Sequence, residues 1–485
     1  MVHSRVDANC LLVLLLAGFA LAPLTYPGFV QAWQGFAPAY ALQDLRAGLP
    51  LEFWGVAWPP RAGAEGPLPY LLSAAWTALG ASPVAALRWT WAAGILLGAL
   101  GAYTWLRGSW GPVPALLGAV AYTYTPYFLN ALYARGVLGE ALALGTLPWL
   151  GWAVTRTGWK RPLALALGLG ALVLTLPGLA FLAAWPLGAL AALHGRSRGR
   201  WTAWSLLLLG VLMGTGSAWT LVREGAPVPL HALLTVGPPL KNPWSLGLVP
   251  VAAWFGGGAA WLSPGMAEQR REVGLWLGTF LLGLLGATLW PGGLPLWTPL
   301  SLTALAVPPL VGAVAAAWPA LTRTEVAAGA LALVVLAAQP LLTPPFTRLD
   351  PSTAPSAVWQ EPGGGRIALL RSEVRAEQGR VHLDLSWQAW GQVQGDYTLF
   401  VHLVDEDGRI LAQEDAPPVG GARPTAGWRP GEIVEESRTL PLPQGTSGPL
   451  RLALGWYLPQ TGERLPLVRA ALPAEPDHRV WLHVP

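Results

Sequence analysis

The stretch at residues 122–140, YTYTPYFLNALYARGVLGE, carries the charged side chains best placed for chemistry. Arg135 and Glu140 stand among mainly apolar neighbours, and charges in such segments tend to pair, to face a cavity or to serve a site. A guanidinium stays charged and makes forked contacts with phosphate, while a carboxylate can orient it or accept a proton. Their spacing of five is not that of helical ion pairs, which leaves room for each to have a partner elsewhere.

The same stretch has a plainer interpretation. Tyr122, Tyr124, Tyr127 and Tyr133 are amphipathic and suit a water–lipid boundary, and Pro126 interrupts the helix between them. An interfacial loop with an aromatic belt would have the same residue types, so both interpretations stay open.

A long segment before this stretch, residues 28–69, supplies carboxylates. Its acids are Asp44, Glu52 and Glu65, and residues 38–48, PAYALQDLRAG, predict a short amphipathic helix that ends at a glycine. Asp44 and Arg46 flank the end of that helix, where charged side chains are usually solvated. A catalytic carboxylate there would act as a general base, or would hold a metal or position an acceptor.

The elements that would position these residues are helices in a membrane. The chain of 485 residues is 53% hydrophobic and only 12% charged, with a mean hydropathy of +0.43, whereas soluble domains are about a quarter charged. Counting apolar runs of about 20 residues predicts a multi-pass helical protein with about 11 spans. They fall near residues 10–27, 83–106, 112–125, 137–154, 162–193 (two spans), 201–222, 244–262, 273–290, 296–318 and 326–342.

Charge predicts the orientation of these spans. Most Arg and Lys residues fall in loops on one side if the N-terminus is cytoplasmic, as the positive-inside bias requires. An odd number of spans then puts the segment 28–69, the turn at 127–136 and the C-terminus on the extracytoplasmic side. The net charge of +4 is spread over helix ends and does not indicate a nucleic-acid partner.

The composition changes after the helical region 1–343. Residues 344–365 form a Pro, Ser and Gly linker, and residues 366–485 alternate polar and apolar side chains, which predicts an antiparallel β-sandwich. Hairpin turns are expected at 376–379, 405–408 and 459–462. The sandwich tryptophans could stack on sugar rings, although core packing is favoured.

The sequence lacks the motifs that several common chemistries require. Cys10 is the only cysteine, so a disulfide within the chain and a cysteine metal site are excluded. The histidines show no metal-ligand spacing, and no phosphate-binding loop, serine-hydrolase or zinc-protease motif is present. No metal ligands are therefore proposed, and a cofactor stays unknown, with a divalent metal as one possibility.

A resemblance follows from the residues Tyr124, Pro126, Tyr127, Tyr133, Arg135, Gly136 and Glu140. This pattern resembles the YxPY…YxRGxxxE signature of bacterial membrane proteins labelled 6-pyruvoyl-tetrahydropterin synthase-related, which are similar to GT-C glycosyltransferases. The segments AYALQDLRAGLPLEFWGVAWPP, PLPYLL and FVHLVDEDGRILAQEDAPPVGGARPTAGWRPGE are also similar. Relatives carry an acid and a His at the positions of Gln31 and Gly35, and His-Asn at Pro177-Gly178.

The resemblance implies a reaction and a place in the cell. A sugar would move from a polyprenyl-phosphate carrier to a glycan or protein acceptor outside the bacterial cytoplasmic membrane. Arg135, Tyr127, Tyr133 and Arg46 would bind substrate, and Asp44 and Glu140 would be catalytic.

Two alternatives accompany this hypothesis. Since Gln31 cannot act as the acid, Asp44, Glu52 or Glu65 would take its place. Otherwise the chain would be a non-catalytic scaffold, or would bind lipid-linked glycan, having lost the first-loop acid. Arg135→Ala is expected to abolish function and spare membrane insertion, because a boundary charge contributes little to packing.

Overall fold

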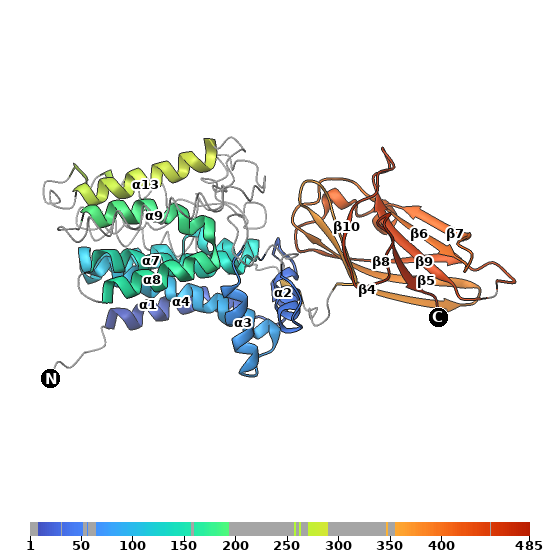
Figure 1. Ribbon diagram of the computed structural model, residues 1–485, viewed down its shortest axis with the longest axis horizontal. Helices are drawn as coiled ribbons and strands as arrows, with labels where there is room; N and C mark the ends of the chain where they lie inside the picture. Colours follow the sequence, from blue (N-terminus) through green and yellow to red (C-terminus); the bar gives the residue numbers. More distant parts are fainter. Residues whose placement is uncertain are drawn as a thin grey trace. The chain divides into compact units, whose positions relative to one another are not determined.

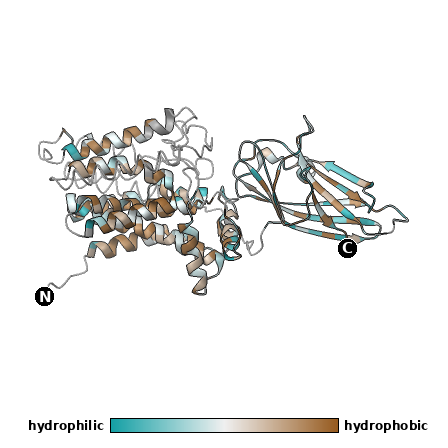
Figure 2. Cartoon of the chain, in the orientation of Figure 1, coloured by the Kyte–Doolittle hydropathy of each residue, from teal (hydrophilic) through white to brown (hydrophobic). Residues whose placement is uncertain are grey.

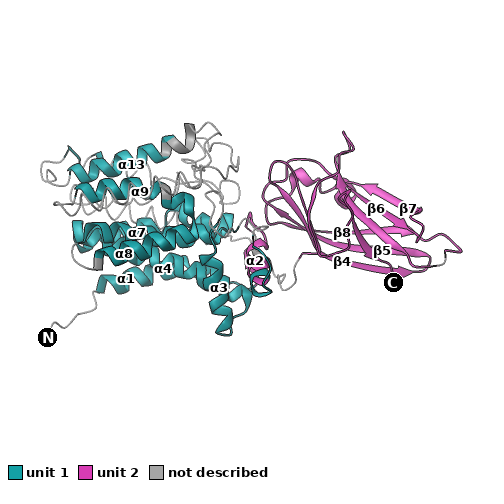
Figure 3. Ribbon diagram, viewed as in Figure 1, with its two compact units in different colours: residues 1–27, 44–344 teal, residues 28–43, 345–485 magenta. Residues whose placement is uncertain are grey.

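The computed structural model describes residues 8–30, 32–51, 56, 65–156, 160–193, 257–258, 261–262, 270–289, 346–347, 355–446 and 448–485. The chain divides into two units, which Figure 3 distinguishes by colour. A helical unit comprises Met1–Pro27 and Asp44–Pro344, and a sandwich unit comprises Gly28–Gln43 and Pro345–Pro485. The first-loop segment Gly28–Gln43 therefore belongs with the C-terminal strands.

The first unit is built of helices, and most of the longer ones lie side by side in Figure 1. They are α1 (Ala8–Ala20), α3 (Leu68–Ala78), α4 (Pro83–Trp110), α5 (Pro112–Thr123), α6 (Pro126–Asn130), α7 (Leu138–Thr155), α8 (Lys160–Thr175), α9 (Pro177–Leu193) and α13 (Arg270–Leu289), with the 3-10 helix Ala22–Thr25 after α1 and a π-helical turn, Ala131–Arg135, after α6. Proline stands at the first turn of several of them, where its missing N–H costs nothing.

Glycines let α4 and α7 pack closely and in parallel. A Cβ on Gly94 would lie 2.8 Å from the carbonyl oxygen of Ala141, and one on Gly145 would lie 2.5 Å from that of Gly94. Further along both helices, a Cβ on Gly151 would lie 2.5 Å from the Trp105 ring. Small residues at such crossings allow backbones to approach, as in membrane helix pairs.

The prediction of about 11 membrane spans is wrong. Within the ranges that the structure describes, only α4, with 28 residues, is long and apolar enough to cross a membrane. Apolar runs that looked continuous are divided by Pro and Gly into shorter helices, such as α1 with 13 residues and α5 with 12, whereas a bilayer needs about 20. Helix α7 has 18 residues but contains Glu140 and Pro148.

Four predicted spans cannot be compared with the structure. Those near 201–222, 244–262, 296–318 and 326–342 lie wholly or mostly outside the described residues.

The helical unit displays apolar side chains outwards. Figure 2 shows its helices as largely hydrophobic, and exposed members include Leu15 at 63%, Leu167 at 65% and Leu282 at 72%. Where such side chains adjoin one another, they mark contact with a partner or a lipid phase.

The sandwich unit has two main antiparallel sheets, as the alternating pattern predicts. One has the order β10 (Leu467–Ala470), β3 (Ala357–Gln360), β4 (Arg366–Glu377), β5 (Arg380–Trp390) and β8 (Ile433–Pro441). The other has the order β11 (Val480–His483), β9 (Arg451–Tyr457), β6 (Thr398–Val404) and β7 (Ile410–Ala416). Short 3-10 turns, Pro418–Gly421 and Thr425–Gly427, lie between β7 and β8.

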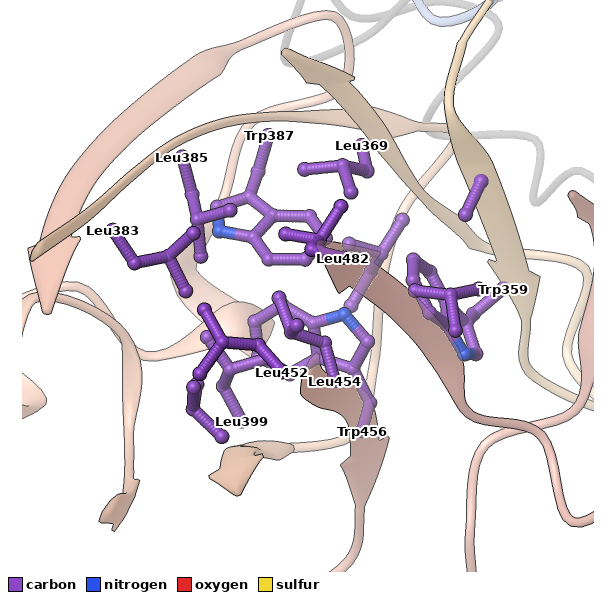
Figure 4. Packing of buried hydrophobic residues seen from close by; sticks show 14 of the residues in the cluster. Trp359, Leu369, Leu383, Leu385, Trp387, Leu399, Leu452, Leu454, Trp456 and Leu482 are labelled. Carbon is purple, nitrogen blue, oxygen red and sulfur yellow. The ribbon is translucent and has the colours of Figure 1, made fainter. Parts of the chain in front are cut away.

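Four tryptophans form the centre of the sandwich. Trp359, Trp387, Trp428 and Trp456 are at most 1% exposed, and the ring centroids of Trp387 and Trp456 are 4.8 Å apart. Figure 4 shows Trp359, Trp387 and Trp456 packed with leucines from both sheets. The prediction that Trp387, Trp428 and Trp456 pack in the core is confirmed, and Trp359 joins them. These four side chains are therefore not available to stack on sugars.

All three expected hairpin turns are confirmed, the one at 459–462 by the N–H of Leu458, which donates to the carbonyl of Glu463 at 2.9 Å. Gln378 and Gly379, both with positive φ, join β4 to β5 as a two-residue turn. Asp405 accepts the backbone N–H of Arg409 on Oδ1 at 2.8 Å between β6 and β7, so its carboxylate closes a turn.

The segment Gly28–Gln43 is built into the sandwich unit. Its strand β1 (Phe29–Val30) pairs with β2 (Phe346–Thr347), and helix α2 (Ala37–Arg46) begins within the segment. The N–H of Phe36 donates to Gln388 Oε1 at 3.0 Å, and the N–H of Gly391 donates to the carbonyl of Trp33 at 2.6 Å. Gly35 has φ of +52°, and a Cβ there would lie 2.4 Å from the Trp390 ring.

Candidate functional site

Arg135 and Glu140 form a buried ion pair with each other. Arg135 Nε donates to Glu140 Oε2 at 3.0 Å, and Arg135 Nη2 lies 2.8 Å from Oε1. The Tyr127 hydroxyl donates to Oε1 at 2.5 Å, and the Arg135 guanidinium lies 4.3 Å from the centroid of the Tyr127 ring. Arg135 is 2% exposed and Glu140 is fully buried. This three-residue group, the buried cluster, holds its cation and its anion in forked geometry.

The backbone between the two charges makes this pairing possible. The π-helical turn Ala131–Arg135 ends at Gly136, which adopts the left-handed conformation with φ of 70°. The N–H of Val137 then donates to the carbonyl of Ala131 at 3.0 Å, and α7 starts one residue later. Because the helix stops and restarts here, a spacing of five brings the side chains together. π-Turns of this kind occur often at functional sites.

Glu65 is the first-loop carboxylate beside this cluster. Its Oε1 accepts the N–H of Gly139 at 2.9 Å and its Oε2 accepts the Tyr70 hydroxyl at 3.0 Å. Gly139 is the second residue of α7, and Val137, which precedes the helix, supplies no side-chain cap. Glu65 thus satisfies one of the N–H groups left open at the start of a helix.

Burial raises the pKa of Glu65 to about 7, against an ordinary value of 4.5. Loss of hydration is the largest cause, and the negative charge of Glu140 acts in the same direction. The hydrogen bonds from Gly139 and Tyr70 oppose the shift. A carboxyl that titrates near neutrality can accept or donate a proton under ordinary conditions.

Close backbone contacts hold Glu65 in place. The N–H of Gly66 donates to the carbonyl of Thr175 at 2.9 Å, and a Cβ on Gly66 would lie 2.0 Å from the carbonyl oxygen of Leu174. A Cβ on Gly139 would lie 3.0 Å from Glu65 Oε1. Gly66 and Gly139 therefore let the loop lie against the end of α8 and the start of α7.

The neighbouring tyrosines are buried and make structural contacts. Tyr133 donates its hydroxyl to the carbonyl of Ala20 at 2.7 Å, and Tyr124 donates to that of Leu16 at 2.6 Å. Both bonds fasten α1 to the stretch around the buried cluster. Tyr133, predicted to bind substrate, thus directs its hydroxyl to α1, and the aromatic-belt interpretation does not describe these side chains.

The other predicted site residues lie at the end of α2. Asp44 is 4% exposed, and its backbone carbonyl accepts the N–H of Leu49 at 2.8 Å. Arg46 is exposed in the last turn. The expected solvated helix end therefore holds for Arg46 and not for Asp44. Glu52 lies outside the described residues.

Sequence reasoning missed Tyr70 and left Glu65 undecided among three acids. Tyr70 is 3% exposed, in the first turn of α3, and burial, followed by the negative charge of Glu65, raises its pKa well above the ordinary value. The PLPY motif that contains Tyr70 was the only feature of the sequence that pointed to this residue. Among the described residues no three His, Cys, Asp or Glu side chains are placed to hold a metal ion.

No protein-family model matches the chain, and no curated protein matches it.

Proposed function

We propose that the chain transfers a sugar from a polyprenyl-phosphate carrier to an acceptor hydroxyl, with Glu65 as the proton-accepting group. The observation that carries the proposal is the position of Glu65 on the N–H of Gly139, beside the buried cluster, with a pKa of about 7. The exposed apolar surface of the helical unit supports action at the bacterial cytoplasmic membrane.

In the proposed reaction the acceptor oxygen attacks the anomeric carbon of the sugar. The bond between that carbon and the carrier phosphate breaks, and the phosphate leaves with the electron pair. Ionised Glu65 takes the proton of the acceptor hydroxyl, so charge balances across the step. Its near-neutral pKa suits this work because the base is substantially ionised at pH 7 and still holds a proton well.

Arg135 and Glu140 are assigned a positioning role. Both oxygens of Glu140 already accept hydrogen bonds from Arg135 or Tyr127. The pair thus ties the π-helical turn that ends at Arg135 to the first turn of α7, whose Gly139 contacts Glu65. Direct binding of the carrier phosphate by Arg135 stays a prediction, and it requires the phosphate to compete with Glu140.

A second candidate is a protein that binds lipid-linked glycan without turnover. The position where the related proteins carry a His is Gly35, and a Cβ there would lie 2.4 Å from Trp390 and 2.7 Å from Gln388 Oε1. The sandwich unit therefore leaves no room for a histidine at this position. If that histidine is indispensable to the chemistry, the chain keeps the binding function alone.

Transfer of a radiolabelled sugar from a polyprenyl-phosphate donor distinguishes these candidates. The purified full chain in lipid would be tested with Glu65→Gln, and with Glu406→Gln as a matched control at an exposed turn residue of the sandwich unit. We expect product from the wild type and from Glu406→Gln, and at least a hundredfold less from Glu65→Gln.

Saturable donor binding without product would support the glycan-binding candidate. Full transfer by Glu65→Gln would show that another group takes the proton, and neither binding nor transfer would reject both candidates.

A further inference from the structure

Four helix ends meet at the side of the helical unit away from Glu65. They are the ends of α4 and α7 and the starts of α8 and α13. Helix α7 is parallel to α4, as the contacts of Gly94 and Gly151 show. It is antiparallel to α8, since a Cβ on Gly168 of α8 would touch Leu150 of α7 while Gly139 lies near Thr175. The rings of Trp105 and Trp276 are 4.7 Å apart, which brings the start of α13 to the end of α4. We call this the basic end of the unit.

The basic end is rich in buried donors without acceptors. Within the described part of the chain, no acceptor is found for these buried atoms: Nε and Nη2 of Arg161, and the indole Nε1 of Trp105, Trp110, Trp152 and Trp276. By contrast, Trp149 Nε1 donates to the carbonyl of Leu97 at 2.9 Å. Buried donors are nearly always satisfied, so a group of them calls for acceptor atoms from a ligand.

Positive charge accompanies these donors. Arg107 lies in the last turn of α4, Arg156 follows α7, Arg161 lies in the first turn of α8, and Arg270 and Arg271 begin α13. Glu272 is the acidic residue on the first turn of α13. The Arg156 guanidinium lies 5.7 Å from the centroid of the Trp152 ring, so cation and indole are adjacent.

We propose that the basic end binds the phosphodiester headgroup of an anionic phospholipid. Helix α4, the described helix suited to cross a membrane, ends here with Arg107 and Trp110. At that depth a bilayer presents phosphate and ester carbonyl oxygens, which accept from guanidinium and indole groups. The excess of arginines favours anionic over zwitterionic lipid, because each cation near the surface adds attraction.

This site is independent of the proposed function. Glu65 contacts the second residue of α7 and Arg156 follows its last residue, and 18 residues of helix rise about 27 Å. Loss of lipid binding would leave the chemistry at Glu65 untested, and loss of activity in Glu65→Gln would leave the lipid site intact.

The test uses the purified full chain in a neutral detergent. Native mass spectrometry would measure the dissociation constants of phosphatidylglycerol and phosphatidylcholine, and inorganic phosphate would be titrated as a competitor. Arg161→Gln removes a fork of donors, and Trp152→Phe removes one indole N–H while keeping a ring beside Arg156. Arg409→Gln, at an exposed turn of the sandwich unit, and Trp149→Phe, whose N–H is satisfied internally, are the matched controls.

We expect the wild type to bind phosphatidylglycerol at least tenfold more tightly than phosphatidylcholine. Arg161→Gln and Trp152→Phe should reduce that preference severalfold, while both controls keep it. Equal affinity of the wild type for the two lipids would overturn the proposal, as would unchanged preference in Arg161→Gln and Trp152→Phe. Displacement of phosphatidylglycerol by millimolar inorganic phosphate would show a free-anion site and overturn the lipid assignment.

Discussion

Gly139 donates its backbone N–H to Glu65 Oε1 at 2.9 Å, although 74 positions separate the two residues. The contact joins the end of the first long loop to the first turn of α7, which also carries Glu140. It makes Glu65 the first-loop acid with a defined place beside Arg135, Glu140 and Tyr127.

Glu65→Gln should remove a pH dependence from the stability of the helical unit. The raised pKa of Glu65 stabilises the fold fully below its ordinary value of 4.5, and this contribution is lost as pH rises through about 7. At most about 4 kcal/mol is involved, because the pKa rises from 4.5 to about 7 and one pKa unit corresponds to about 1.4 kcal/mol. Thermal unfolding from pH 4.5 to 8 should show the wild-type midpoint falling more than that of Glu65→Gln. Parallel curves would mean that Glu65 titrates normally.

Gly66→Ala should destabilise the helical unit and displace Glu65. Its Cβ would lie 2.0 Å from the carbonyl oxygen of Leu174, which is backbone and cannot turn aside. Overpacking of this kind costs about 1–3 kcal/mol. Gly170→Ala in α8 is the matched control, since its Cβ meets nothing within 4 Å. Circular dichroism melting should separate the two variants, and similar midpoints would contradict the close approach at Gly66.

Arg135→Ala should destabilise the helical unit as well as impair activity. The sequence suggested that this charge contributes little to packing, but the structure shows Arg135 buried against Glu140 and Tyr127. Removing one partner leaves a buried carboxylate uncompensated, which costs about 3–5 kcal/mol. Detergent-solubilised protein should melt at a lower temperature than the wild type.

The double variant Arg135→Met/Glu140→Leu provides the control for that prediction. It removes both charges and keeps apolar volume, so it should recover much of the stability lost in Arg135→Ala. If the double variant were no more stable than Arg135→Ala, the cost would lie in lost packing around Arg135 and not in an unpaired charge.

Gly35→Ala should loosen the segment Gly28–Gln43 from the sandwich unit. The new Cβ would meet Trp390 at 2.4 Å and would also occupy a left-handed backbone position. Gly364→Ala shares the positive φ, but its Cβ meets nothing within 4 Å, so it reports the backbone strain alone. Limited proteolysis near residue 35 should accelerate in Gly35→Ala and change little in Gly364→Ala.

The sandwich unit could be predicted well because its signals are local. Alternation along β5, with Val381, Leu383 and Leu385 inward, follows from the period of two of a strand. The two-residue turn at Gln378 and Gly379 also follows from residue type. By contrast, the attachment of Gly28–Gln43 depends on Phe36 meeting Gln388 across 352 positions, and no local pattern indicates such a pairing.

The apolar composition of the helical unit led to the wrong prediction of about 11 membrane spans. Apolar content identifies buried helices as readily as membrane spans, and the lengths of α1 and α5 show where Pro and Gly end them. Gly94 and Gly145 bring α4 and α7 into close contact, so part of the apolar surface of both helices is buried between them.

The candidate site was predictable in part. The RGxxxE pattern drew attention to Arg135 and Glu140, but their spacing suggested separate partners, and the left-handed turn at Gly136 was needed to join them. Choosing Glu65 over Asp44 required knowing that Gly66 lies against Thr175. Such contacts come from tertiary packing, which residue types alone do not reveal.

The central claim is that Glu65 accepts a proton during sugar transfer, and a pH–rate profile tests it most directly. With saturating polyprenyl-phosphate sugar, the wild-type rate should rise about tenfold per pH unit and level off above about 7, since only ionised Glu65 acts as a base. Glu65→Gln should be at least a hundredfold slower and show no such rise. A Glu65→Gln profile that coincides with that of the wild type would contradict the account.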